Sequence, residues 1–204
     1  MNNANIITEI TIQKKNKNRI NIFIDDQYAF SVNSAQALDL KTGDKISRDR
    51  IDQLKKMDDA DKAYNRALYF LKFRPRSRAE FVRYLKDKNF TAEAVAKTIN
   101  RLETNKLIDD PAFARLFVEN RRNFRPKGAY ALRYELKAKG ISEKIIGEVL
   151  DGYDEESAAW AALAPKMKQW GNLEKKEFKK KAFAFLRRRG FDFNTCQAMG
   201  SNLD

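Results

Sequence analysis

The fold is decided by the stretch Phe73-Arg74-Pro75-Arg76-Ser77-Arg78, which recurs 51 residues later as Phe124-Arg125-Pro126-Lys127-Gly128-Ala129. At the same offset, Arg83-Tyr84-Leu85-Lys86-Asp87-Lys88-Asn89-Phe90 aligns with Tyr134-Glu135-Leu136-Lys137-Ala138-Lys139-Gly140-Ile141. A third copy is Leu186-Arg187-Arg188-Arg189-Gly190-Phe191, in which Leu186 lies 50 residues after Leu136. Repeats with a period near 50 residues indicate a stack of similar supersecondary units.

Each copy is expected to fold as three helices. In the first copy, a helix over 62–73 ends before Arg74-Pro75, because the residue that precedes a proline is disfavoured in the α region. A second helix starts at Ser77, which forms a capping box with Glu80. It ends at Asn89, as its counterparts end at Gly140 and Gly190, since both residue types tolerate the left-handed conformation. Further N-caps are predicted at Thr91 and Ser142, and Asp109-Asp110-Pro111 is expected to place an acidic N-cap before a proline at N1.

Apolar residues at helical spacing predict the buried face of each helix. They are Phe81, Tyr84, Leu85, Ala92, Val95, Ile99 and Leu102 in the first copy, Phe113, Leu116, Phe117, Ile145, Ile146, Val149 and Leu150 in the second, and Trp160, Leu163, Met167, Phe178, Ala182, Phe185 and Leu186 in the third. Pro165 is expected to kink or shorten its helix. The single cysteine, Cys196, aligns with Val95 and Ile146, so we expect a buried, inert thiol.

The first 61 residues follow a period of two instead. One side of a predicted strand carries Ile6, Thr8, Ile10 and Ile12, and similar alternation continues through Ile20, Ile22, Ile24 and then Tyr28, Phe30, Val32. Asp25-Asp26-Gln27 between the last two runs is typical of a tight turn. This pattern predicts a three-stranded antiparallel meander with one buried face, followed by short helices near 35–40 and 48–56.

Charge divides the chain at the same place. The 204 residues carry a formal net charge of +13, whereas residues 1–61 are electrically balanced, so the surplus belongs to 62–204. A polyanionic partner is favoured by such a balance, because phosphate neutralisation releases counterions. We therefore expect a mainly α protein in which a small antiparallel three-stranded β element precedes three tandem three-helix repeats in an elongated array. The expected parts are 1–61, 62–109, 110–153 and 154–204.

Several function classes are disfavoured by composition. The chain has no histidine and one cysteine, which excludes histidine-based catalysis and thiol zinc sites, and it lacks a glycine-rich phosphate loop. We expect no enzyme activity, cofactor or metal, and we interpret Asp109-Asp110 as helix caps. No apolar run approaches the length of a membrane span, and the N-terminus lacks the pattern of a secretory signal. A cytoplasmic monomer without membrane contact is expected.

Three motifs resemble the RecX family of regulatory proteins. The first is Phe73-Arg74-Pro75-Arg76-Ser77-Arg78-Ala79-Glu80 followed by Leu85-Lys86-Asp87-Lys88-Asn89-Phe90, the second is Leu107-Ile108-Asp109-Asp110-Pro111-Ala112-Phe113-Ala114, and the third is Lys127-Gly128 with Leu136-Lys137-Ala138-Lys139-Gly140-Ile141. The resemblance is strong over 62–151 and looser over the third repeat, and Asn89 stands where the family usually has glycine. It implies a modulator of RecA in recombination, DNA repair and the SOS response. Such a protein would bind the RecA filament on single-stranded DNA and inhibit strand exchange, ATP hydrolysis and co-protease activity.

The contact surface is expected on the exposed basic face of each repeat. Its candidates are Arg74, Arg76, Arg78, Arg83 and Lys86 in the first repeat, Arg121, Arg122, Arg125, Lys127, Arg133, Lys137 and Lys139 in the second, and Arg187, Arg188 and Arg189 in the third, with Lys175, Lys176, Lys179, Lys180 and Lys181 beside them. We interpret Tyr84, Phe117 and Tyr134 as core residues rather than base-stacking platforms. Trp160 and Trp170 are likewise expected to be structural.

Two other functions are compatible with the same residues. Each three-helix unit could act like a helix-turn-helix and bind DNA by itself, weakly or as its main activity. Binding of naked DNA with a steep salt dependence would indicate that module, whereas a filament regulator should bind the RecA filament much more tightly. A scaffold for an acidic protein partner is the third possibility.

Overall fold

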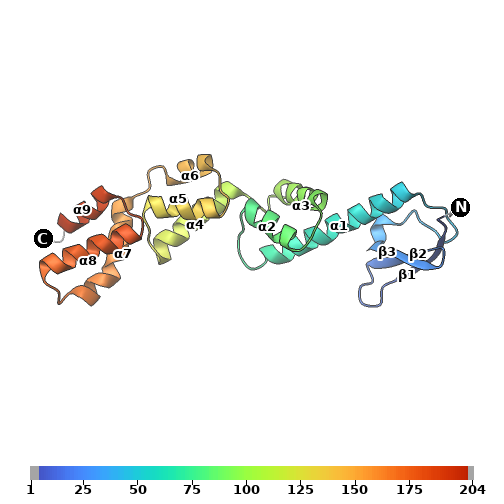
Figure 1. Ribbon diagram of the computed structural model, residues 1–204, viewed down its shortest axis with the longest axis horizontal. Helices are drawn as coiled ribbons and strands as arrows, with labels where there is room; N and C mark the ends of the chain where they lie inside the picture. The colour runs from blue at the N-terminus through green and yellow to red at the C-terminus, as the bar shows by residue number, and fades with distance from the viewer. Residues whose placement is uncertain (1–4, 202–204) are drawn as a thin grey trace. The chain divides into compact units, whose positions relative to one another are not determined.

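The computed structural model describes residues 5–201 and contains two compact units. One unit consists of the residues up to Arg74 together with Phe81–Leu107, and the other of Pro75–Glu80 together with the residues from Ile108 onward. Among the described residues, a small sheet is followed by nine α-helices (Figure 1). The mainly α fold with a three-stranded β element is thereby confirmed.

The sheet is the predicted antiparallel meander. Its strands are β1 (Ile7–Ile12), β2 (Arg19–Ile24) and β3 (Gln27–Asn33), in the order β1-β2-β3. Asp25 and Asp26 have φ values of 49° and 62°. Positive φ at both central positions is the requirement of a type I′ hairpin turn, whose twist matches that of the flanking strands. The tight turn predicted at Asp25-Asp26-Gln27 is therefore confirmed.

A β-bulge alters the predicted alternation of β1. The register shifts between Ile7 and Glu9, while Ile12 still pairs with Ile20. Because one extra residue is inserted, Ile7 turns into the core and is fully buried, whereas Ile12 is 66% exposed at the strand end. The prediction that placed Ile12 and not Ile7 with the regularly alternating isoleucines was wrong at these two positions.

Helix α1 (Arg48–Leu71) corrects the prediction of two separate helices over 48–56 and 62–73. It runs without interruption through the acidic residues 58–61, where the sequence boundary was drawn. The short helix expected near 35–40 is a 3-10 turn at Ser34–Gln36. Leu54 faces the sheet core and Ala67 is also fully buried, so both ends of α1 are anchored by packing. This tertiary packing outweighs the low helix propensity of the aspartates.

The remaining helices complete three consecutive groups of three. They are α2 (Arg78–Asp87), α3 (Ala92–Thr104), α4 (Asp110–Phe124), α5 (Ala129–Ala138), α6 (Glu143–Leu150), α7 (Glu155–Trp170), α8 (Lys175–Arg188) and α9 (Phe193–Ser201). The capping box is reciprocal: the Glu80 amide donates to Ser77 Oγ and the Ser77 amide donates to Glu80 Oε2, both at 3.2 Å. Caps at Thr91 and Ser142 are also confirmed. The acidic cap expected before Pro111 is Asp109, and because α4 begins at Asp110 the proline is the second residue of the helix and not the first.

Most of the predicted core is buried, with three exceptions. Leu116 is 42% exposed and Met167 is 39% exposed, because Val118 and Leu163 occupy the inward positions of their helices. Ala92 is exposed, since Ala94 takes its place. Of the two effects expected of Pro165, a kink or a shorter helix, shortening does not occur, because α7 continues to Trp170. The carbonyl that proline leaves without a donor belongs to Ala161, which is exposed to solvent.

Two repeat joints lie within the second compact unit. In the first, Ser77 Oγ donates to the carbonyl of Lys139 at 2.6 Å, and Gly140 lies against Ala79. In the second, the Gly128 amide donates to the carbonyl of Arg189 at 3.1 Å, and Gly190 lies against Ala131. Each joint therefore sets the N-terminus of one second helix on the C-cap of the next. The repeated sequence thus forms the same kind of packing interface at both joints.

Candidate basic interface

The first-repeat candidates lie on the outside of α2 and on the loop before it. Phe81 and Leu85 are fully buried, as predicted, and Arg83 and Lys86 on the opposite side are exposed. Arg74 and Arg78 are exposed as well, whereas Arg76 is half-buried. The exposed faces of this helix and loop therefore carry four of the five predicted cations, although their binding role stays a prediction.

Two second-repeat candidates are structural ion-pair partners. Glu135 of α5 accepts from Arg121 Nε at 2.8 Å and from the Lys127 ammonium, and the Arg121 guanidinium also lies 4.7 Å from the Phe117 ring centroid. Partial burial raises the pKa of Glu135, but the hydrogen bonds and charges of these two cations outweigh it and leave that pKa below its usual value. Arg121 and Lys127 thus hold α4, the following loop and α5 together.

The other second-repeat cations divide into paired and exposed groups. Arg133 and Lys137 both bind the carboxylate of Glu143 on α6, with Arg133 Nη1 2.7 Å from Oε2. Lys139 Nζ lies 2.9 Å from Oε1 of Glu80, across the first repeat joint. Arg122 and Arg125 are exposed. The sequence pattern indicated an exposed basic contact face, but five of its seven second-repeat members bind carboxylates.

Arg122 also lines an open hollow of about 380 Å³ between α4 and the turn before α7. The hollow contains one further arginine, Arg115, together with Glu119, Asp151 and Asp154. Its carboxylates outnumber its cations, so this hollow does not fit a polyanion.

In the third repeat, the three consecutive arginines have different environments. Arg187 and Arg188 are exposed, and Arg187 Nη1 donates to the carbonyl of Phe191 at 3.0 Å. Arg189 is half-buried at the second repeat joint, where its Nη1 donates to the carbonyl of Pro126 at 3.1 Å. Desolvation lowers the pKa of Arg189, and nearby Arg125 adds to that effect. Arg189 is consequently a packing residue more than a surface cation.

Exposed aromatic residues are the main feature that sequence patterning missed. Tyr134, interpreted as core, is 72% exposed, and Tyr130 one turn earlier on α5 is 78% exposed. Tyr84 is half-buried and stacks on Phe70 with ring centroids 3.9 Å apart, in agreement with the core prediction. Phe117 packs beside the second-repeat core. The helical position of Tyr134 would have shown this. Leu132 and Leu136 fill the inward side of α5, so Tyr134, midway between them in sequence, lies on the outward side.

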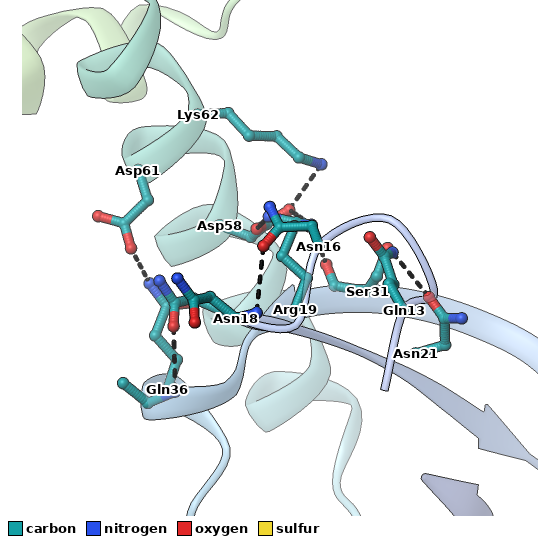
Figure 2. A network of polar contacts seen from close by, with 12 residues as sticks. Gln13, Asn16, Asn18, Arg19, Asn21, Ser31, Gln36, Asp58, Asp61 and Lys62 are labelled. Atoms are coloured by element: carbon teal, nitrogen blue, oxygen red, sulfur yellow. Dashed lines mark hydrogen bonds and ion pairs between the residues drawn. The ribbon is translucent and has the colours of Figure 1, made fainter. Parts of the chain in front are cut away.

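A polar network that the sequence did not predict joins the sheet to α1 (Figure 2). Arg19 of β2 donates from Nη1 to Oδ1 of Asp58 at 2.6 Å and from Nη2 to Oδ2 at 3.1 Å. Lys62 adds an ion pair to Asp58, and Gln36 Nε2 donates to Asp61. Figure 2 shows these side chains converging between the β-strands and the helix. The acidic run is therefore an anchoring site for the β element and not a linker.

Within residues 5–201, no cluster of three histidine, cysteine or carboxylate residues is arranged to hold a metal ion. Over the same range, no helix is both long and apolar enough to cross a membrane. Asp109 accepts from the Ala112 amide, and Asp110 accepts from the Arg78 amide at 2.7 Å. These contacts agree with the interpretation of the Asp109-Asp110 pair as helix caps.

Fold and surface together define a class: a scaffold of basic three-helix modules carrying a small β element. Family models match three parts of the chain, namely the regulatory protein RecX N-terminal domain over residues 5–47, the first RecX three-helix domain over 63–102 and the second over 109–150. The chain belongs to the RecX family of regulatory proteins.

Similar proteins agree with that assignment. Regulatory protein RecX of Bacillus subtilis (strain 168) is 36% identical over 197 residues, which cover 94% of this chain and 75% of the relative. Regulatory protein RecX of Lactobacillus gasseri is 34% identical over 206 residues, covering 98% of this chain and 75% of the relative. A crystal structure of regulatory protein RecX has a TM-score of 0.74 at 27% identity and covers 95% of this chain and 97% of its own. RecX from Lactobacillus salivarius, at 24% identity and a TM-score of 0.65, shares the fold over 72% of this chain and 98% of its own.

Proposed function

We propose that this protein binds the RecA filament on single-stranded DNA and inhibits RecA strand exchange, ATP hydrolysis and co-protease activity. It would act in the cytoplasm as a monomeric binding protein without catalysis or a cofactor. The family supports a regulatory role, and the RecX resemblance implies RecA as the partner.

Three cations occupy equivalent positions in the three repeats, and this pattern favours them as the contact residues. Lys86, Lys137 and Arg187 are exposed, and each is the second-last residue of the second helix in its repeat. Each also follows a leucine that is fully buried. The packing leucine therefore fixes the orientation of the cation in the same way three times. A cation repeated once per module suits a partner that is itself periodic and negatively charged.

A purely structural role for these cations must be separated from binding. A positive charge in the last turn of a helix interacts favourably with the helix dipole, by about 0.3–1 kcal/mol per residue. Loss of a cation would then lower the melting temperature without a specific effect on RecA. Both quantities must be measured on the same variant.

The decisive experiment titrates the pure protein into RecA hydrolysing ATP on single-stranded DNA. We expect inhibition at protein amounts below one per RecA monomer, and a clear loss of inhibition in the Lys86→Ala/Lys137→Ala variant with helicity unchanged by circular dichroism. A matched control is Lys56→Ala/Lys97→Ala, which removes two cations that pair with Glu93. Undiminished ATP hydrolysis with excess wild-type protein would contradict the proposed function.

Direct DNA binding remains the alternative. It is favoured by the charge of α8, in which seven of 14 residues are lysine or arginine. A protein of that kind would bind naked DNA as tightly as the filament. Parallel titrations with naked DNA and with RecA-coated DNA distinguish the two functions.

A further inference from the structure

Strand β1 forms one edge of the sheet, because the strand order is β1-β2-β3. The first half of this edge is covered by the segment 43–46. The Ile7 amide donates to the carbonyl of Asp44 at 2.9 Å, and the Ile7 carbonyl accepts from the Gly43 amide at 2.8 Å. The bulge beside Ile7 also increases the local twist of this half, which hinders the approach of another strand.

The second half of β1 directs backbone groups away from the sheet. The Gln13 amide donates to the carbonyl of Arg19 at 2.9 Å, so these two residues form a hydrogen-bonded pair. Because hydrogen-bonded and non-hydrogen-bonded pairs alternate in an antiparallel ladder, Ile12 and Ile10 occupy non-hydrogen-bonded positions. Their N–H and C=O groups therefore point outward. Within residues 5–201, those groups form no backbone hydrogen bond to a segment outside the sheet.

The open edge, which we define as Ile10, Thr11 and Ile12, has none of the features that protect sheet edges. Such edges usually carry a charged residue, a proline, a bulge or a covering segment. The three residues are uncharged and β-branched, their pairing with β2 is regular, and Ile12 is 66% exposed. An extended segment could therefore pair with the outward groups of Ile10 and Ile12, as in other complexes formed by strand addition.

The charges beside the open edge indicate what kind of segment would bind. Lys14, Lys15 and Lys17 follow β1 directly and are exposed. In the part of the chain that the structure describes, none of the three forms an ion pair. The one acidic residue of β1 is Glu9, at the other end of the open edge. Carboxylates on an added strand would therefore be attracted to its lysine end.

We propose that the open edge of β1 binds an acidic extended segment of a partner protein as a fourth strand of the sheet. The backbone of the segment bonds the N–H and C=O groups of Ile10 and Ile12, and its carboxylates pair with Lys14 and Lys15. This inference goes beyond the proposed function, because the bound segment requires neither RecA nor DNA. It gives the β element a binding role of its own.

A second copy of this chain fits the open edge less well. Antiparallel pairing that sets Ile10 of each copy opposite Ile12 of the other also sets Lys15 opposite Ile7. The outward groups of Ile7 are already bonded to Gly43 and Asp44. Parallel pairing in register would place the lysines of both copies side by side, where like charges repel.

The test measures binding of the full chain to a fluorescein-labelled octapeptide of alternating glutamate and valine by anisotropy. We expect saturable binding. Two further peptides are methylated on the backbone nitrogen of every second residue, one at the glutamates and the other at the valines. One of them should bind about tenfold more weakly and the other like the parent peptide, because only one set of amides faces β1. Attraction between charges alone would bind both methylated peptides equally.

Ile12→Pro removes an outward amide without removing a hydrogen bond to β2, so an edge strand tolerates it. We expect this variant to bind the parent peptide about tenfold more weakly. Ile12→Val is its matched control, because it keeps the amide, and it should bind within about twofold of the wild type. Lys14→Gln/Lys15→Gln should bind about fivefold more weakly at low salt and show a smaller salt dependence.

Lys56→Gln/Lys97→Gln removes the same charge from lysines that pair with Glu93 and should retain wild-type affinity. Equal affinity of the two methylated peptides would overturn the proposal, and so would a failure of the parent peptide to bind at millimolar concentration. Wild-type affinity in a folded Ile12→Pro variant would also overturn it. If circular dichroism shows that this variant disturbs the sheet, the methylated peptides decide alone.

Tighter binding of an oligothymidylate than of the peptide, unaffected by Ile12→Pro, would assign the lysines to nucleic acid and overturn the proposal. Absence of RecA inhibition would contradict the proposed function alone and would leave peptide binding intact. Loss of peptide binding with full RecA inhibition would contradict strand addition alone.

Discussion

Gly140 lies against Ala79 so closely that a Cβ added at Gly140 would overlap the Cβ of Ala79. The glycine also has a φ of 78°, in the left-handed region. The same relationship recurs at the second joint, where Gly190 has a φ of 81° and an added Cβ would lie 2.7 Å from the Ala131 amide nitrogen. Two requirements therefore fall on one residue type: a backbone conformation that glycine adopts freely, and a close approach of the next helix.

Replacement of Gly140 by alanine should destabilise the protein. A left-handed backbone costs a residue with a Cβ about 1–2 kcal/mol, and overpacking against Ala79 adds about 1–3 kcal/mol. We expect a loss of about 2–5 kcal/mol in the free energy of unfolding, measured by urea denaturation. Gly147→Ala is the control: Gly147 lies in α6 with open space around its added Cβ, so it should gain about 0.5–1 kcal/mol. Equal effects of the two substitutions would contradict the close-packing argument.

The same geometry explains why Asn89 is accepted where the other two repeats have glycine. Asn89 has a φ of 60° and is exposed, so only the first of the two requirements applies to it. Asparagine meets that requirement more easily than most residues. Sequence reasoning predicted the left-handed caps correctly from residue type. It did not predict the close approach, because the neighbours of a cap depend on how the repeats pack.

The ion pair between Arg19 and Asp58 should contribute more to stability than an exposed pair. The two side chains are 17% and 6% exposed, and Arg19 also donates to the Ser31 carbonyl. Asp58→Ala would leave Arg19 in a partly buried position without its anion, at an expected cost of about 3 kcal/mol. Asp39→Ala, which breaks an exposed pair with Arg50, should cost less than about 1 kcal/mol. Thermal unfolding of both variants measures the difference, and similar losses would contradict the anchoring role of Asp58.

The acidic run that contains Asp58 marks where sequence interpretation failed and why. A change in charge balance after Asp61 indicated a boundary, but carboxylates within this run bind the sheet on one side and α3 on the other. Asp59 accepts from Thr91 Oγ1 at 2.7 Å, and Asp61 lies 3.4 Å from Arg101 Nη1. Local patterns that depend on neighbours in sequence, such as the capping box at Ser77, were predicted. Partners between 30 and 40 residues away were not, because their pairing depends on tertiary structure.

Acid should weaken the fold in part through Glu135. Its pKa in the folded protein is lowered by Arg121 and Lys127, so its contribution to stability is fully present above the unfolded-state value of about 4.3 and is lost as the pH falls through the lower folded value. We expect the wild type to lose more stability below about pH 4.3 than a Glu135→Gln variant, which has no proton to bind there. Urea midpoints at neutral and acid pH measure this. Parallel curves for the two proteins would show that Glu135 makes no such contribution.

Cys196 should react with thiol reagents only when the third repeat opens. The thiol is 1% exposed, and burial raises its pKa, the largest of the effects on it, so the reactive thiolate is scarce at neutral pH. Since it is the only cysteine of the chain, the rate of maleimide labelling reports the opening of that repeat alone. We expect slow labelling in buffer, rapid labelling in urea, and faster labelling of Gly190→Ala, in which the joint beside Arg189 is disrupted. Gly147→Ala, in another repeat, should label at the wild-type rate. Immediate labelling of the wild type in buffer would place Cys196 at the surface and contradict the packing of α9 on the third-repeat core.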